Sequence, residues 1–243
     1  MKKIFIAAAA LSAIIFVSAC GAEINLSGVE ETRAHAVADN YTSLRISSAI
    51  SAVLSADADS VKIIADGNVI DYVSVEQQGG ELVLSVKFPS GFGLVRGGFD
   101  VRAIVPCSPS LSKVKVSGAS SLAADKAMEA GELSVRLSGA SSFRGEIIAD
   151  TAHLAISGAS DARLCGRVLS CDMSLSGASS LKGLDGNLLE TDVAGIDISG
   201  ASNARFVCNG TLSGEVSGAS SVKCGGDADW SVSATGASSI SRK

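Results

Sequence analysis

Lys and Arg side chains recur at a regular spacing along the second half of the chain. The five residues are Arg144, Arg163, Lys182, Arg205 and Lys223. Each lies six residues after the start of a repeated tetrapeptide, so all five take the same position in successive repeats. A row of basic side chains is the residue type that binds a linear anionic ligand, such as an acidic polysaccharide or the phosphates of lipopolysaccharide. The alternative is a solvated face whose long side chains cover neighbouring apolar surface.

Asp150, His153 and Ser157 have the residue types of a nucleophilic triad. The chain is so rich in serine that this spacing arises easily by chance. Few acidic residues share a repeat position, so the paired carboxylates of β-helical polysaccharide lyases and hydrolases are not indicated. The scattered acidic residues are Asp125, Glu146, Asp150, Asp172, Asp185, Glu190, Asp192 and Asp197. We therefore predict a non-enzymatic protein, with a polysaccharide lyase or hydrolase of the β-helix type as the alternative.

The cysteines and histidines do not form a metal-binding pattern. Five cysteines follow Cys20, and an odd number leaves at least one thiol free or paired with another molecule. They are Cys107, Cys165, Cys171, Cys208 and Cys224. Bridges Cys165–Cys171 and Cys208–Cys224 are candidates in an oxidising envelope, and small core residues are the alternative. No short paired Cys motif occurs, and His35 and His153 lie far from such a cluster, so we expect neither metal nor cofactor.

The tetrapeptide that sets this spacing returns seven times. Its copies begin at Ser117, Ser138, Ser157, Ser176, Ser199, Ser217 and Thr235, and read Ser-Gly-Ala-Ser except that the last begins with Thr. A period near twenty residues indicates a solenoid in which each repeat buries its apolar face only against its neighbours. The formal net charge of −5 argues against bulk nucleic-acid binding.

Apolar residues stand two apart before each tetrapeptide, as in Val114 and Val116, and again five residues after its start, as in Leu122. This is the period of a strand with one buried face. Each repeat therefore reads as strand, tight corner and strand, which predicts an all-β parallel β-helix with coils of about 19 residues. At the corner, Gly118 is free to adopt a positive φ. We expect Ala119 to point into the corner and the serines to bond backbone groups there and from coil to coil.

The N-terminus has the features of a signal peptide over residues 1–19, with a basic start and a short apolar run. Residues 17–20, Val-Ser-Ala-Cys, resemble the lipobox of bacterial lipoproteins. The resemblance implies cleavage before Cys20 and attachment of diacylglycerol to its thiol, which makes the membrane a partner. Gly21 rather than Asp follows, which favours the outer membrane over retention at the inner one; which side the domain faces is left open.

Residues 20–40 show little periodicity and are expected to form a lipidated tether. Residues 41–105 contain strand-like runs without the tetrapeptide, and we predict irregular coils that continue the same sheets and cap one end. Within them, residues 90–99 are predicted to be a loop. Residues 106–243 carry the regular repeats, so 41–243 form one β-helix domain. Exposed coil ends are strand edges, which makes end-to-end self-association possible.

The lipobox, the strand-rich first part and the two stretches at 99–106 and 111–120 together resemble the head GIN domain family, adhesin-like lipoproteins common in Bacteroidetes. The resemblance covers roughly residues 41–240. It implies a single right-handed parallel β-helix, a role in adhesion or scaffolding with a glycan or envelope protein as partner, and no catalytic residues. For a bacterium of that group, Thr151 and Ser60 also match a short O-glycosylation pattern.

Overall fold

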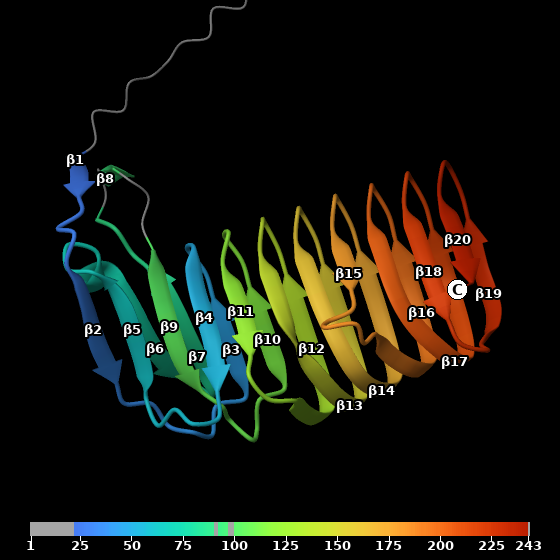
Figure 1. Cartoon of the computed structure of the whole chain (residues 1–243), viewed down its shortest axis with the longest axis horizontal. Coiled ribbons are helices and arrows are strands. Elements are labelled where there is room, and N and C mark those ends of the chain that lie inside the picture. Colours follow the sequence, from blue (N-terminus) through green and yellow to red (C-terminus); the bar gives the residue numbers. More distant parts are fainter. Residues whose placement is uncertain (1–21, 90–91, 97–99, 243) are drawn as a thin grey trace, which may run out of the picture.

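The computed structural model describes residues 22–89, 92–96 and 100–242. Apart from one 3₁₀ turn, η1 (Ile70–Tyr72), every regular element of this part is a β-strand. The strands stack into one solenoid of about seven turns with a spacing of about 19 residues (Figure 1). The predicted all-β parallel solenoid is confirmed. No helix among the described residues is long and apolar enough to cross a membrane.

Two long flanks of the solenoid meet at the Ser-Gly-Ala-Ser corners. The leading flank is made of the strands that run into the corner. In spatial order it contains β6 (Val73–Gln78), β7 (Glu81–Val86), β3 (Ser43–Ile46), β10 (Lys113–Val116), β12 (Met128–Leu137), the C-terminal parts of β13 (Ser142–Ile156), β14 (Asp161–Leu175), β16 (Leu189–Ile198) and β17 (Asn203–Val216), and β19 (Asp229–Ala234).

The trailing flank is made of the strands that leave the corner. In spatial order it contains β2 (Glu30–His35), β5 (Val61–Asp66), β9 (Val101–Pro106), β4 (Ile50–Ser55), β11 (Ser121–Ala124), the N-terminal parts of β13 and β14, β15 (Ser180–Lys182), the N-terminal part of β17, β18 (Ser221–Gly225) and β20 (Ser239–Arg242). All pairings in the regular repeats are parallel. Strands β13 and β14 run without a break from this flank to the leading one.

The core is a stack of equivalent side chains. The predicted columns are confirmed: the residue before each corner is buried from Val116 to Val216, and so is the fifth residue after the start of the corner from Leu122 to Val222. Phe143 and Phe206 are completely buried in two of the coils. Only the last coil departs, since Ala234 is exposed and Ile240 is half-buried.

Glycine at the corner is required by both its backbone conformation and the closeness of the next coil. Gly158 has φ +74°, and an added Cβ would overlap the carbonyl oxygen of Gly139 in the preceding corner. That oxygen accepts a 2.7 Å hydrogen bond from the backbone N–H of Ala159. The equivalent bond recurs along the corners, as from Ala178 to Gly158. The corner is thus a main-chain ladder in its own right.

The prediction for the corner alanine is wrong, because Ala119 and its equivalents point to solvent. The fourth residue, the second serine, is the one that turns inward, and Ser160 and Ser179 are each 1% exposed. The inward hydroxyls bond locally and between coils, as predicted. Ser202 Oγ donates to the carbonyl oxygen of Ser199 (2.8 Å) and lies 3.2 Å from Ser179 Oγ.

Residues 41–105 continue both flanks, but their order along the chain is not their order in space. Strands β3 and β4 form a coil with its own corner at Ser48 and Ala49, whose φ values are +67° and +60°. This coil lies between β10–β11 on one side and β7–β9 on the other. The chain therefore builds an inner coil first and adds the outer one later. The outermost pairs, β2–β5, β5–β9 and β6–β7, are antiparallel and close this end of the solenoid.

Two segments differ from the sequence-based expectation. Residues 20–40 are not a plain tether, since β2 pairs along β5 and β1 (Ala22–Asn25) pairs with β8 (Phe92–Arg96). Because the side chains of β2 are mostly exposed, it lacks the apolar alternation that reveals a strand. Residues 90–99 contain β8 and so are not wholly a loop. Residues 1–19, with the signal-peptide prediction, and Cys20 lie outside the described residues.

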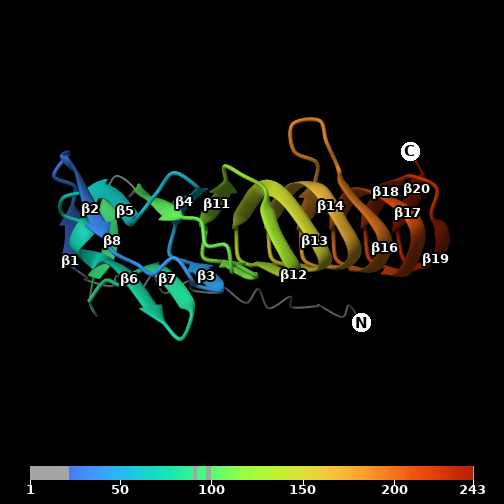
Figure 2. The ribbon, with the colours of Figure 1, turned by 90° about the horizontal axis from the view of Figure 1, so that it is seen from below.

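One loop projects from the regular coils. Residues 183–188 leave the trailing flank between β15 and β16 and stand clear of the stack (Figure 2). Paired hydrogen bonds of 2.9 Å between Leu184 and Asn187 close the two-residue turn at its tip. The loop accounts for the longest interval between corners, 23 residues from Ser176 to Ser199.

Replacing Gly158 by Ala should lower the free energy of unfolding by roughly 2 kcal/mol or more, because the positive φ and the overlap with Gly139 act together. Gly186→Ala is the matched control: Gly186 has φ +87°, but nothing lies within 4 Å of an added Cβ. It should cost only the conformational part, about 1 kcal/mol. Urea denaturation measures both, and equal losses in the two variants would show that the close approach of the coils contributes nothing.

Candidate functional site

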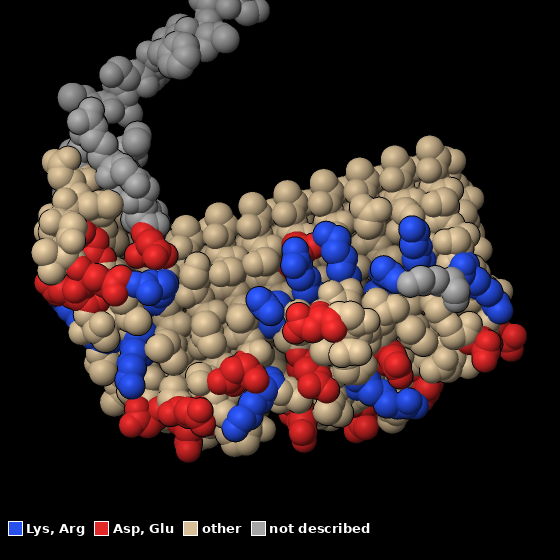
Figure 3. All heavy atoms as spheres, in the orientation of Figure 1, with Lys and Arg blue, Asp and Glu red and all other residues tan. Residues whose placement is uncertain are grey.

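The five predicted basic residues form one row on the outer face of the trailing flank. Arg144 pairs in register with Arg163, Arg163 with Lys182, and Arg205 with Lys223. Arg205 is half-buried and the other four are exposed. Figure 3 shows basic side chains crossing the front of the regular coils, below an edge without charged residues. We call these five residues the basic row; the structure brings all of them together on one flank.

One carboxylate neutralises the middle of the basic row. Asp161 accepts hydrogen bonds of 2.9 Å from Arg163 Nε and from Lys182 Nζ, and a further one from Ser180 Oγ. Burial raises the pKa of Asp161, but these three hydrogen bonds outweigh it and hold the pKa below its ordinary value. Sequence reasoning missed Asp161, although its place two residues before Arg163, where the other repeats carry Ser or Asn, was available as a signal.

The ends of the basic row have no such partner. Arg144, Arg205 and Lys223 make no ion pair with a carboxylate among the described residues, and Arg205 Nε is buried without a hydrogen-bond partner in that same part of the chain. At the N-terminal end the equivalent position is Ala123, which leaves a shallow hollow of about 210 Å³ beside Arg144. Positive charge is therefore available at both ends of the row and offset in its middle.

A second row of polar groups runs beside the basic row. Ser142, Asp161, Ser180 and Asn203 pair in register one after another, two positions before the basic residues. Ser221 and Ser239 continue this row. Hydroxyl, amide and guanidinium groups therefore stand side by side along the flank. That combination can offer both hydrogen bonds and charge to a polymer lying across the coils.

The structure does not assemble the triad of Asp150, His153 and Ser157. Four residues of extended strand separate His153 from Ser157, a span of about 13 Å. Ser157 Oγ is engaged with the carbonyl oxygen of Leu137 at 3.3 Å. His153 instead lies between acids of the adjacent coils, with Nδ1 3.3 Å from Asp172 Oδ2 and Nε2 3.9 Å from Glu132 Oε1.

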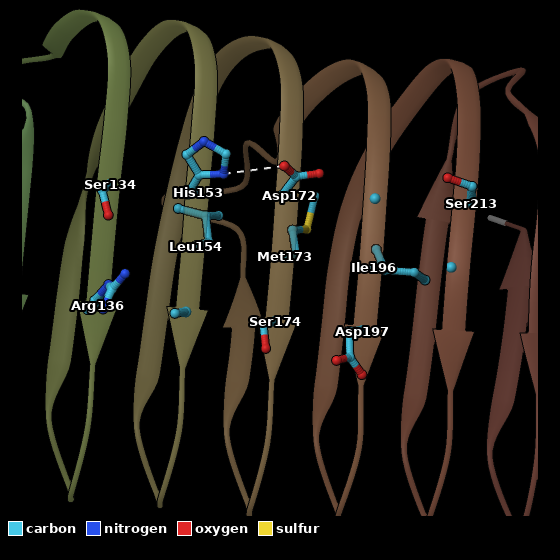
Figure 4. A pocket seen from close by; sticks show the side chains of 13 residues that line it. Ser134, Arg136, His153, Leu154, Asp172, Met173, Ser174, Ile196, Asp197 and Ser213 are labelled. Carbon is cyan, nitrogen blue, oxygen red and sulfur yellow. Dashed lines mark ion pairs between the residues drawn. The ribbon is translucent and has the colours of Figure 1, made fainter.

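His153 borders a shallow hollow on the leading flank that the sequence did not reveal. The hollow measures about 420 Å³ and crosses β12, β13, β14, β16 and β17. Figure 4 shows two rows of side chains in it, one with His153 and Asp172 and the other with Arg136, Ser174 and Asp197. The floor is low because Ala155 and Gly195 occupy places where neighbouring coils carry longer side chains.

The five cysteines after Cys20 are free thiols in the structure. Cys165 and Cys171 lie on the same strand, β14, and are not bridged; nor are Cys208 on β17 and Cys224 on β18. Burial raises the pKa of Cys171 to about 12, so its thiol is protonated and unreactive at neutral pH. The described residues contain no cluster of three or more His, Cys, Asp or Glu side chains able to hold a metal ion.

The two residues that match an O-glycosylation pattern lie at different places. Thr151 is half-buried on β13. Ser60 is half-buried just before β5, and its Oγ donates a 2.9 Å hydrogen bond to Asp59 Oδ1. Their modification stays a prediction.

Known proteins share this fold. The family described as "Putative auto-transporter adhesin, head GIN domain" matches residues 40–228. A "putative adhesin" from Bacteroides fragilis is 18% identical, with 90% of this chain and 100% of that chain covered and a TM-score of 0.76. A "putative adhesin" from Parabacteroides merdae is 17% identical, with coverages of 91% and 99% and a TM-score of 0.66.

A third structure, a "Putative lipid binding protein" from Parabacteroides distasonis, is 18% identical, with coverages of 91% and 100% and a TM-score of 0.68. At these identities the likeness shows the fold alone. Comparison with curated proteins finds no match.

Replacing Asp161 by Asn should lower the free energy of unfolding at pH 7 by about 1 kcal/mol, because Arg163 and Lys182 lose their shared counter-charge. The folded-state pKa of Asp161 is depressed, so its contribution is full above the unfolded pKa, near 4, and is lost as the pH falls through the lower folded value. Urea denaturation at pH 7 and near pH 3 should therefore show a difference from wild type that shrinks in acid.

Asp150→Asn is the control for this experiment. Asp150 is exposed and makes no ion pair within the described part of the chain, so the free energy of unfolding should stay within about 0.5 kcal/mol of wild type at both pH values. A loss in Asp161→Asn that is the same at both pH values would contradict an electrostatic role for this carboxylate.

Proposed function

Because this chain belongs to the family described as "Putative auto-transporter adhesin, head GIN domain", we propose that it is a non-enzymatic protein of the cell envelope that serves adhesion or scaffolding. The observation that carries the proposal is the rigid flank itself, on which outward side chains repeat from coil to coil. Equivalent residues stand about 4.8 Å apart, so one contact made by a coil can be repeated along the solenoid. Such a surface suits an extended partner.

The family and the similar structures are described as adhesins, not as enzymes. The geometry agrees with a role without catalysis: the only residues that formed a triad in the sequence are apart, and His153 pairs with Asp172 instead. Asp161, the carboxylate that is bonded to the basic row, is occupied by Arg163 and Lys182. A polysaccharide lyase or hydrolase would need a pair of carboxyl groups facing one substrate bond.

We propose further that a lipid on Cys20 holds the protein at the outer membrane. The observation behind this is the lipobox-like sequence at residues 17–20, followed by Gly21 rather than Asp. The first described strand, β1, lies at the end of the solenoid away from the C-terminal coil (Figure 1). A lipid two residues before β1 would therefore leave the regular repeats free to project from the membrane.

Replacing Cys20 by Ser should move the protein from the membrane fraction to the soluble fraction, because two or three acyl chains anchor a protein firmly and none remains in the variant. Mass spectrometry of the wild-type N-terminus should find the added lipid on Cys20. Cys107→Ser, a change of the same kind at a half-buried thiol within the solenoid, should stay in the membrane fraction. Wild-type protein without lipid would refute the anchor.

An anionic glycan is the ligand that the trailing flank supports best. The basic row supplies charge at a repeat of about 4.8 Å, and the neighbouring polar row supplies hydroxyl and amide groups. Because Asp161 offsets Arg163 and Lys182, we assign most of the binding to Arg144, Arg205 and Lys223. The phosphates of a lipopolysaccharide present the same chemistry.

Binding should be measured against acidic and neutral glycans with the full chain carrying Cys20→Ser, at low and raised salt. We expect binding to acidic glycans that weakens with salt. Replacing Arg144, Arg205 and Lys223 by Ser should weaken it roughly tenfold or more. Replacing Arg163 and Lys182 as well, which removes all five residues of the basic row, should add little.

A charge-matched control replaces Lys62, Lys113 and Lys126 by Ser, three exposed lysines outside the basic row. It should bind like the parent protein. Equal losses in the control would show attraction to overall charge rather than a site. If neither acidic glycans nor lipopolysaccharide bind, the basic row is a solvated face and scaffolding is the remaining role.

A further inference from the structure

The leading flank carries a second charged row, and its two signs are separated. The residues that pair in register across it run from Arg45 through Lys115, Arg136, Ala155, Ser174, Asp197 and Glu215 to Ser233. The six from Lys115 to Glu215 comprise two basic residues, then two small ones, then two acidic ones. Arg136, Asp197 and Glu215 are exposed, and Lys115 is half-buried. We call these six residues the bipolar row.

The charges of the bipolar row are not satisfied by one another. Arg136 and Asp197 are three coils apart, which is about 14 Å between their backbones. Within the described residues, Arg136, Asp197 and Glu215 form no ion pair. Lys115 Nζ lies 3.5 Å from Glu81 Oε1, a carboxylate that it shares with Arg45. Three of the four charges are thus exposed and form no ion pair within the described part of the chain.

We propose that this flank binds the same flank of a second copy of the chain, around a two-fold axis parallel to the strands. Such an axis reverses the order of the coils and keeps each row opposite itself. The axis passes between Ala155 and Ser174. Arg136 and Asp197 then lie one and a half coils from the axis on opposite sides, and Lys115 and Glu215 lie two and a half coils from it. Arg136 therefore faces Asp197 of the second copy, and Lys115 faces its Glu215. An isologous contact repeats each pair twice.

The neighbouring row obeys the same symmetry. His153 and Asp172 lie half a coil on either side of the same centre, so each faces the other residue across the axis. Within one copy His153 Nδ1 already lies 3.3 Å from Asp172 Oδ2, and dimerisation would bring two such His–Asp pairs together. Around the centre, Ala155 and Gly195 leave the hollow of about 420 Å³, with room for water between the copies. The charged ends of the bipolar row make the contact.

The contact between the two copies is small and polar, so the association is weak. Four strand residues in each of six coils cover about 13 by 29 Å, or roughly 400 Å² per copy. That falls below a standard stable interface, so the association belongs to the weak, transient class. Because exposed ion pairs carry it, salt should weaken it. The two copies point in opposite directions, with their N-terminal ends at opposite ends of the pair. Neither the lipid anchor nor the glycan ligand is needed for this pairing.

Sedimentation of the full chain carrying Cys20→Ser, at concentrations up to about 1 mM, tests the proposal in low and raised salt. We expect a monomer–dimer equilibrium in low salt that shifts to monomer in raised salt. Arg136→Glu and Asp197→Lys each place like charges opposite one another twice and should weaken dimerisation about tenfold or more. The double variant Arg136→Glu/Asp197→Lys again places opposite charges face to face and should recover most of the loss.

Matched controls are Lys126→Glu and Asp150→Lys, the same changes of charge outside the leading flank's outer face. They should dimerise like the parent, and thermal melting should show all variants folded. A protein that stays monomeric in low salt overturns the proposal. So does a double variant that dimerises no better than the single variants, because the recovery depends on the two-fold pairing of residues 136 and 197. Equal weakening by the controls also overturns it, since it would indicate attraction by net charge.

Discussion

Main-chain hydrogen bonds between successive coils hold equivalent residues about 4.8 Å apart, and the other features of the molecule depend on that spacing. At the corner it brings the backbone of Gly158 so close to Gly139 that no side chain fits between them. In the interior it stacks like on like, so each apolar side chain is covered by its equivalents above and below. An inward serine finds its partners the same way, as Ser202 does with Ser179.

The same spacing imposes repetition on the outside, where it has an electrostatic cost. Equal charges in adjacent coils repel, so a basic row needs a counter-charge or an anionic ligand. The trailing flank supplies one counter-charge, Asp161, for its middle two residues and leaves the ends available. On the leading flank the signs are separated along the row, with Arg136 before the small residues and Asp197 after them. The first arrangement suits an anionic polymer, and the second suits its own copy.

A stack of coils also has two ends that expose backbone groups, and the structure treats them differently. At the N-terminal end the strands β2 and β6 turn antiparallel; the side chains of β2 are mostly exposed, and β6 is largely half-buried. Ion pairs such as Arg33–Asp71 hold β2 in place there. At the C-terminal coil, the Arg242 guanidinium lies 4.8 Å from the ring centre of Trp230 and donates to the carbonyl oxygen of Ala228. A single cation thus covers the last aromatic side chain of the core.

The sequence by itself determined the repeat, the strands on both sides of the corner, the buried columns and the alignment of the basic row. These follow from a short-range period, because a residue that recurs at a constant place in each coil must stack on its equivalents. Tertiary structure decided what depends on pairing between distant segments or on orientation at a bend. The coil of β3 and β4 lies inside one that follows it in the chain, β2 pairs with β5 although its side chains are mostly exposed, and Ala119 faces outward where its small size predicted the reverse. The roles of Asp161 and of the bipolar row could not be recognised from the sequence. Their partners lie on other coils or on a second copy, so they are found only once neighbouring coils are placed in register.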